Sequence, residues 1–256
     1  MLYAAAFSAY KPYIRQLPSR PLTKADLLHE RFLLAESGPV SMYYAPHNEI
    51  VNPYAQILIA GLTPGWSQMK LAFETARDCL QQNQGPELRD EDILQQAKEA
   101  ARFAGPMRNN IIRMLDTLDL PAPLGLSSAQ LLFEGSQQLL HTTSVLRYPV
   151  FARGHNYTGS RPDLLSSDFL RDFAVNSIQG ELGSLDACGG GFRRVLVIPL
   201  GKAVEGICRV LVQKGILREE QCLWGFPHPS GANGHRVRQF NEQRGSMREI
   251  IRAYFR

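Results

Sequence analysis

Cysteine is scarce in this sequence, and its four cysteines lie far apart in the chain. No two of them form a CxxC pair, the usual source of the clustered soft ligands in zinc and iron–sulfur sites. We therefore expect neither a metal site nor a cofactor. Isolated thiols fit a reducing compartment, so the sequence predicts a cytoplasmic protein in which the cysteines are reduced. These are Cys79, Cys188, Cys208 and Cys222.

Long apolar runs are also missing. No uninterrupted apolar run approaches the length of a membrane-spanning helix. The first ten residues are apolar, but no basic region precedes them and Lys11-Pro12 follows, so they do not resemble a secretory signal. The sequence shows no internal repeat and no low-complexity segment. We expect no membrane partner, and a monomer is our expectation for an oligomeric state that the sequence leaves open.

The chain is long enough to bury a full core. It has 256 residues, of which 44% are hydrophobic, which predicts one domain or one domain with additions. Residues 1–50 are interrupted by prolines, and we interpret them as an N-terminal arm packing on a core domain of residues 51–256. From residue 234 to the end, six arginines face two glutamates, a surplus equal to the whole net charge of +4. This surplus fits either a phosphate-binding surface or a solvated helix face.

Short apolar runs alternate with helix-like stretches along residues 51–256. This alternation predicts an α/β fold, a three-layer sandwich whose central, mostly parallel four-stranded sheet is flanked by helices. Expected strands cover residues 55–60, 139–146, 194–200 and 222–226. Expected helices cover residues 24–35, 68–80, 91–103, 109–118, 163–182, 202–211 and 236–254. The three glycines at 189–191 precede a strand and lack a following GK[ST], so we interpret them as a flexible connection.

Two Pro/Gly-rich loops follow expected strands and precede expected helices. The first is GLTPG at residues 61–65, and the second is GFPHPSGANGHR at residues 225–236. Loops at the carboxyl ends of strands in an open α/β sheet are where such folds place ligands and catalytic groups. We expect the two loops to contribute to one composite site.

With these elements placed, the chain resembles the uracil-DNA glycosylase superfamily over roughly residues 50 to 256. The resemblance rests on Gly61-Leu62-Thr63-Pro64-Gly65 after the first core strand, and on His228-Pro229-Ser230-Gly231 near the end. Three further segments match in order. They are Thr142-Thr143-Ser144-Val145, the polar loop of residues 154–162, and Val197-Ile198-Pro199-Leu200-Gly201-Lys202. Each motif is short, and their order and context make the match moderately specific.

The resemblance implies excision of a base that has left the duplex stack for a pocket. His228 would donate a hydrogen bond to the departing base as negative charge develops on it. Thr63 would position a water, although a hydroxyl carries no charge and is a poor general base. The alternative for Thr63 is that it braces the Pro64-Gly65 turn.

The same resemblance places Thr143 where the family has a base-reading asparagine. A threonine has shorter reach and one donor, which puts a preference for uracil in doubt, and Thr143 is equally well an ordinary strand residue. Phe73 would be a stacking wall or a core side chain. The remaining expected substrate contacts are Gly61, Leu62, Pro64, Gly65 and Ser230.

A nucleic-acid surface is expected on two loops. Charge, amide and aromatic groups alternate in one loop, as phosphate tracking would require. Its residues are Arg153, His155, Asn156, Tyr157 and Arg161. Asn233 and Arg236 would add contacts from the loop after the HPSG motif, where Ala232 and Asn233 replace a large apolar wedge.

The resulting hypothesis is a metal-independent DNA glycosylase-like hydrolase that removes a damaged or deaminated base. A rival is a non-catalytic member of the superfamily that binds nucleic acid or a nucleotide. A third class is an enzyme acting on a small nucleoside or nucleotide. Salt-dependent DNA affinity separates the third class from the others.

Overall fold

The computed structural model describes residues 4–82, 88–135, 137–187 and 195–256. The glycines at 189–191 lie outside the described residues. The chain folds into two compact units, each assembled from segments that are distant in sequence. Unit 1 comprises Met1–Val51, Thr63–Arg102 and Leu146–Asp163, and unit 2 comprises Asn52–Leu62, Phe103–Val145 and Leu164–Arg256. The first fifty residues thus group with two later segments of the chain.

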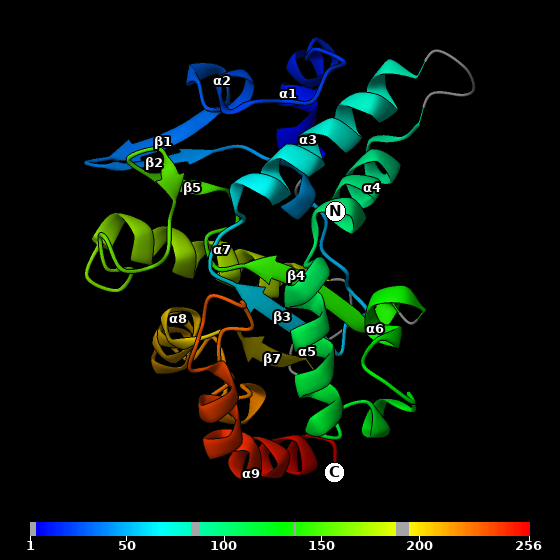
Figure 1. Ribbon diagram of the computed structural model, residues 1–256, viewed down its shortest axis with the longest axis vertical. Helices are drawn as coiled ribbons and strands as arrows, with labels where there is room; N and C mark the ends of the chain where they lie inside the picture. Colours follow the sequence, from blue (N-terminus) through cyan, green and yellow to red (C-terminus); the bar gives the residue numbers. More distant parts are fainter. Residues whose placement is uncertain (1–3, 83–87, 136, 188–194) are drawn as a thin grey trace. The chain divides into compact units, whose positions relative to one another are not determined.

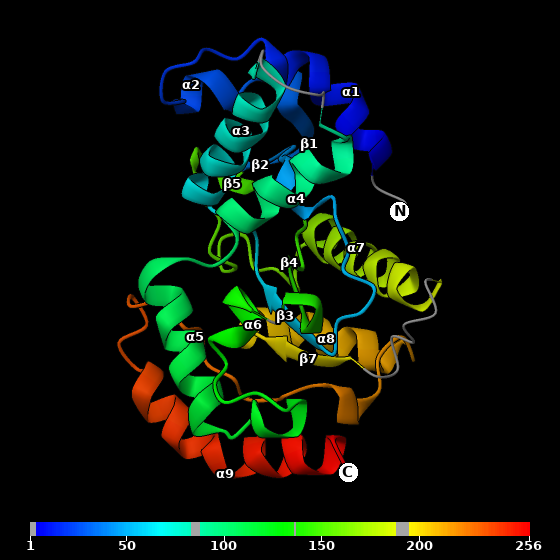
Figure 2. The same cartoon turned by 90° about the vertical axis from the view of Figure 1, so that its right-hand side faces the viewer.

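Unit 1 contains a four-stranded antiparallel sheet in the order β1-β2-β5-β6. Its strands are β1 (Leu33–Ser37), β2 (Val40–Tyr43), β5 (Val150–Ala152) and β6 (His155–Asn156). The helices are α1 (Ala4–Arg15), α2 (Lys24–Leu27), α3 (Trp66–Gln81) and α4 (Asp90–Ala101), and α3 and α4 lie side by side (Figures 1 and 2). The expectation of one helix over residues 24–35 is wrong. A turn at Gly38, with φ of 56°, folds β1 back onto β2, and that pairing outweighs the local helical pattern.

Unit 2 contains a three-stranded parallel sheet in the order β4-β3-β7, coloured green, blue and yellow-brown in Figure 1. The strands are β3 (Ile57–Gly61), β4 (Leu140–Ser144) and β7 (Leu196–Pro199). All three are buried along their length, as expected for parallel strands covered on both faces. The mixed α/β character and the parallel sheet are therefore confirmed.

A four-stranded central parallel sheet is not found in the described part of the chain. The expected fourth strand at 222–226 contributes a single parallel bridge, between Cys222 and Val197. A turn at Trp224-Gly225, with a φ of 80° at Gly225, interrupts the pairing after that bridge, although the Phe226 carbonyl still accepts from the Gly201 amide at 3.0 Å. The sheet that does have four strands is the antiparallel one of unit 1.

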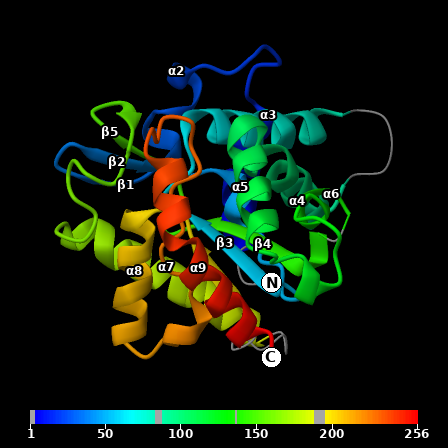
Figure 3. The same cartoon turned by 60° about the horizontal axis from the view of Figure 1, so that its bottom comes forward.

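Helices cover both faces of the unit 2 sheet. On one face, Ile57 and Ile59 of β3 pack with α5 (Gly105–Thr117), α6 (Leu131–Glu134) and α9 (Arg236–Tyr254) in one hydrophobic core. On the other face, β4 bonds to α7 (Asp168–Ala187), which packs against α8 (Lys202–Gln213) (Figure 3). None of the helices in the described part of the chain combines the length and apolarity needed to cross a bilayer.

Candidate functional site

The carboxyl ends of the three parallel strands meet at one edge of the unit 2 sheet. Gly61, the last residue of β3, pairs with Ser144, the last residue of β4, and Ala60 pairs with Pro199 of β7. The ladder continues one step further, since the Val145 amide donates to the Gly61 carbonyl at 2.9 Å. Leu62 therefore leaves this edge, half-buried, as the second residue of the GLTPG segment.

His228 lies at the same edge, against the end of β7. The Gly201 amide donates to the Phe226 carbonyl at 3.0 Å, and a Cβ added to Gly201 would lie 3.0 Å from the Cβ of His228. Gly201 has a φ of 87°, so the backbone that brings His228 this close suits only glycine. Within unit 2, the start of GLTPG and the HPSG loop thus belong to one edge of the sheet.

The imidazole of His228 is held in a form that can donate a hydrogen bond. The Ser230 amide donates to its Nδ1 at 3.3 Å, which leaves the proton of a neutral ring on Nε2. Burial lowers the pKa of His228 because it disfavours the charged ring. The side chain is half-buried, so Nε2–H is a neutral donor at a partly open position.

The HPSG loop is tied down by side chains from two helices. Asn110 of α5 donates to the Pro229 carbonyl at 2.9 Å, and Arg236 of α9 donates to the Ser230 carbonyl at 2.7 Å. Asn233 donates to the His228 carbonyl at 3.2 Å, and the Ser230 hydroxyl accepts from the Ala232 amide at 3.1 Å. Arg236, expected to bind a phosphate, thus shapes this loop, as Asn233 does.

Thr143 is buried and turned towards α7. Its hydroxyl donates to Oε2 of Glu181 at 2.8 Å, and His141, two residues earlier on β4, bonds to Oε1 of the same carboxyl. The single donor of Thr143 is therefore already used. Sequence reasoning missed Glu181, although two polar side chains at alternate positions of an apolar strand signal a polar partner on that face.

Thr63 belongs to unit 1, where its hydroxyl makes two hydrogen bonds. It donates to the Tyr148 carbonyl at 2.9 Å and accepts from the Val150 amide at 3.0 Å. These bonds join the GLTPG loop to the start of β5, which supports the bracing role. Pro64 is buried and Gly65 is half-buried.

The polar loop of unit 1 contacts the same GLTPG segment. Asn156 accepts from the Trp66 amide at 3.0 Å, and its amide nitrogen lies 3.4 Å from a Cβ added to Gly65. Arg153, His155 and Arg161 have exposed surface, as a phosphate-binding role requires. Tyr157 is buried and donates to the Pro162 carbonyl at 2.7 Å, and burial raises its pKa to about 12.

Phe73 is a core side chain of unit 1. It is fully buried and meets Phe32 edge-on, with ring centroids 4.9 Å apart. A base cannot stack on it without movement of α3 or of Phe32.

A buried polar cluster in unit 1 escaped sequence reasoning. Tyr148 donates to Oε1 of Glu49 at 2.6 Å, and burial of that carboxyl raises its pKa to about 7. Tyr44 stacks on Tyr10 at 3.9 Å, and neither its hydroxyl nor the ring nitrogens of His47 have a hydrogen-bond partner among the described residues. The available signal was the dense polar and aromatic content of residues 43–49, in a segment interpreted only as an arm.

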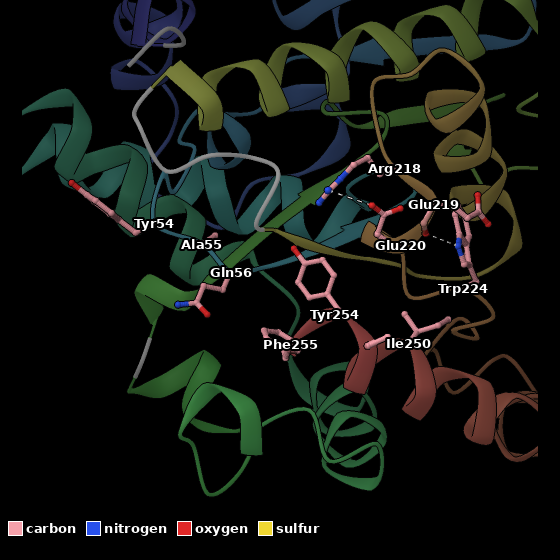
Figure 4. A pocket seen from close by; sticks show the side chains of 11 residues that line it. Tyr54, Ala55, Gln56, Arg218, Glu219, Glu220, Trp224, Ile250, Tyr254 and Phe255 are labelled. Atoms are coloured by element: carbon pink, nitrogen blue, oxygen red, sulfur yellow. Dashed lines mark hydrogen bonds and ion pairs between the residues drawn. The ribbon is translucent and has the colours of Figure 1, made fainter.

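Two hollows open on unit 2. One, of about 730 Å³, adjoins His228. The other, of about 910 Å³, is lined by Tyr54, Gln56 and Tyr254, among others (Figure 4). It lies at the opposite edge of the sheet, because Gln56 directly precedes β3. Of these two, the first adjoins the strand ends from which ligands are bound in open α/β sheets.

Comparison with known proteins places the chain beside one relative. It is 44% identical over 238 residues to "Uncharacterized protein YoxB" of Bacillus subtilis (strain 168), and the alignment covers 93% of this chain and 89% of that protein. No protein-family model matches the chain, and no solved structure matches it. Identity of this size over nearly the full length of both proteins shows common descent. The chain belongs to the same family as YoxB.

Proposed function

We propose that this protein is a DNA glycosylase-like hydrolase that cleaves the N-glycosidic bond of a flipped, damaged or deaminated base. The observation that carries the proposal is His228, a neutral Nε2–H donor held against the end of β7. When the bond breaks, its electron pair leaves with the base and the sugar becomes cationic. A water then adds to the sugar and loses a proton to the solvent, and the anionic base takes up a proton from the solvent.

His228 supplies what the departing base needs. A neutral imidazole can donate a hydrogen bond from Nε2–H to a carbonyl of the base. Burial favours that neutral form of the ring. Because Asn110 and Arg236 hold the loop, the donor is in place before charge develops. Removal of one such preorganised donor costs roughly 10²–10³ in rate in other enzymes.

The resemblance to the uracil-DNA glycosylase superfamily supports the same proposal. Gly61 ends β3, and the HPSG loop follows the segment that bridges to β7 at Cys222. We place residues 222–226 where that superfamily has a further parallel strand, which would complete a four-stranded, three-layer arrangement. Exposed Arg153 and Arg161 would bind phosphates.

The second candidate is a non-catalytic member that binds nucleic acid or a nucleotide. One observation favours it. Thr63 and Thr143, the two polar positions assigned to water and base, both use their hydroxyl donors within the protein. A water at Thr63 would have to be positioned through the remaining lone pair of the hydroxyl.

Incubation with oligonucleotides that carry different lesion bases, followed by detection of abasic sites, tests the proposal. We expect base release from at least one lesion, and a roughly 10²- to 10³-fold slower release by His228→Ala. His235→Ala is the matched control, because His235 is an exposed histidine seven residues along the same loop. Release unaffected by His228→Ala would refute its role. DNA binding without release from any lesion would support the second candidate.

A further inference from the structure

Two glycines with positive φ are among the residues that line the groove beside His228. The groove lies within unit 2, between the start of α8, residues 224–228 and the first turns of α9. The two glycines are Gly201 and Gly225, with φ values of 87° and 80°. A Cβ on Gly225 would lie 3.0 Å from the Gln243 side chain. Both glycines are required by their positive φ and by close packing, since an added Cβ would meet Gln243 at Gly225 and His228 at Gly201.

The groove is lined by three cations, two carboxylates, amides and aromatic rings. The cations are Lys202, Arg209 and Arg238, and the carboxylates are Glu205 and Glu242, of which Glu205 pairs with Arg209 at 2.8 Å. Lys202 is exposed at the start of α8, and no described carboxylate lies within ion-pairing distance of its ammonium group. Arg238 faces Glu242 at 3.7 Å, with both side chains exposed. Three amide side chains complete these walls: Asn233, Gln239 and Gln243.

Trp224 is the more exposed of two aromatic residues that line the groove, since Phe226 is buried. The Arg209 guanidinium lies 4.4 Å from its ring centroid, and its indole nitrogen donates to the Glu219 carbonyl at 3.0 Å. The ring is half-buried and held by both contacts. It lines this groove and also the 910 Å³ hollow, where Figure 4 shows it beside Glu219. A fixed indole with a guanidinium on one face is a firm surface for a base.

These features match the way proteins hold unpaired nucleotides. A cation for the phosphate, an aromatic face for the base and amides for its edge are the elements of single-strand recognition. Proteins that open a duplex instead insert a large apolar side chain between base steps. The loop before α9 has Gly231, Ala232, Asn233 and Gly234, and the exposed apolar residue that follows is the short Val237.

We propose that the groove beside His228 binds an unpaired nucleotide next to the target base, so that the substrate is single-stranded DNA. The proposal deepens the proposed function and rests on it. Lys202 contacts the phosphate of that nucleotide. Trp224 stacks on its base.

Fluorescence anisotropy with one labelled, lesion-free oligonucleotide, alone and annealed to its complement, tests this proposal without any catalysis. We expect the full-length protein to bind the single strand more tightly. Trp224→Ala should weaken single-strand binding by roughly fivefold to a hundredfold, and Trp224→Phe should restore most of it. Tyr54→Ala removes an exposed aromatic ring from the 910 Å³ hollow, which Trp224 also lines, and should change nothing. Weaker binding by Tyr54→Ala would place the strand in that hollow and overturn the inference.

The salt dependence of binding tests Lys202 separately. Lys202→Ala should reduce the slope of log affinity against log salt by about 0.7, because one phosphate contact is lost. Lys214→Ala removes an exposed cation just beyond the other end of α8 and should leave the slope unchanged. A third measurement, of Trp224 fluorescence, leaves every side chain of the groove in place. In Trp66→Phe, Trp224 is the one remaining tryptophan, and the single strand should quench its emission.

The outcomes separate this inference from the proposed function. Tighter binding to the duplex, weakened by Val237→Ala, would show a wedge at α9 and overturn the inference. So would single-strand binding that is indifferent to Trp224, or no binding at all. Trp224-dependent single-strand binding with no release of any lesion base would support the nucleotide-binding groove and refute the hydrolase function. Base release that does not depend on Trp224 would support the hydrolase function and refute the nucleotide-binding groove.

Discussion

The Tyr148 hydroxyl donates a 2.6 Å hydrogen bond to Oε1 of Glu49, a carboxyl that is 3% exposed inside unit 1. Oε2 of the same carboxyl has no hydrogen-bond partner among the described residues. Burial disfavours the ionised form and raises the pKa of Glu49 from 4.5 to about 7, although the bond from Tyr148 opposes that shift. Glu49 therefore ionises near neutral pH in the folded protein.

Glu49→Gln should remove a loss of stability at rising pH. Below pH 4.5 the wild-type carboxyl is protonated in both the folded and the unfolded chain. Between pH 4.5 and about 7 only the unfolded chain gives up the proton, so the free energy of unfolding falls by roughly 3 kcal/mol. Glutamine still accepts from Tyr148 but does not titrate. Urea denaturation at pH 4.5, 6 and 8 measures the difference, and parallel pH curves for both proteins would contradict the assignment.

His47→Gln should remove a loss of stability at falling pH, the opposite of the change expected for Glu49→Gln. His47 is 3% exposed, and burial, aided by the charge of Lys98, lowers its pKa from 6.5 to about 3. As the pH falls below 6.5 only the unfolded chain takes up the proton, so the free energy of unfolding drops by roughly 3 kcal/mol by pH 4.5.

In the wild type these two effects largely offset each other between pH 4.5 and 6.5. The same urea titrations should show that Glu49→Gln loses stability as acid is added, whereas His47→Gln loses it towards neutral pH. The slope with pH is the readout, because it is insensitive to packing changes at the substituted side chain. Equal slopes of the free energy of unfolding with pH in the two variants would refute the opposite pKa shifts of Glu49 and His47.

Thr143→Val should destabilise unit 2 by about 1–3 kcal/mol, because Oε2 of the buried Glu181 loses its donor. Thr143→Ser keeps the hydroxyl and should retain most of the stability. Thermal unfolding followed by circular dichroism measures both. If Thr143 also reads a base, Thr143→Val will change which lesion is released, and not only the melting temperature. Unchanged stability in the valine variant would show that the hydrogen bond to Glu181 is dispensable.

Gly201→Ala should cost about 1–3 kcal/mol of stability, because a φ of 87° is strained for any residue with a Cβ. The new methyl group would also lie 3.0 Å from the Cβ of His228 and displace it. The rate of base release should therefore fall by more than the loss of folded protein explains. Gly231→Ala is the matched control, since nothing lies within 4 Å of its added Cβ. Chemical denaturation and the abasic-site assay, run on both variants, separate the two effects. Equal behaviour of the two alanine variants would contradict the close packing at β7.

Strand positions in unit 2 follow from local sequence. The apolar runs at 55–60, 139–146 and 194–200 coincide with β3, β4 and β7 to within a few residues. Most expected helices of the core are also present, because apolar periodicity and Pro/Gly boundaries act over neighbouring residues. Two expectations failed at glycine turns, at Gly38 and Gly225, and the pairing of the first of these segments also depends on a distant strand. β1 exists because β2 pairs with it, and β2 in turn pairs with β5 more than a hundred residues later.

By itself, the sequence determined the α/β pattern, the two Pro/Gly-rich loops after core strands and the histidine within one of them, since each depends on residues adjacent in the chain. Tertiary structure alone decided which atoms of those residues are free to react. Ser230 sets the tautomer of His228, Glu181 uses the donor of Thr143, and Tyr148 and Val150 occupy the hydroxyl of Thr63. Burial then decided that Glu49 and His47 titrate far from their usual pH. Desolvation and hydrogen-bond pairing depend on every neighbour in space, and a linear pattern does not contain them.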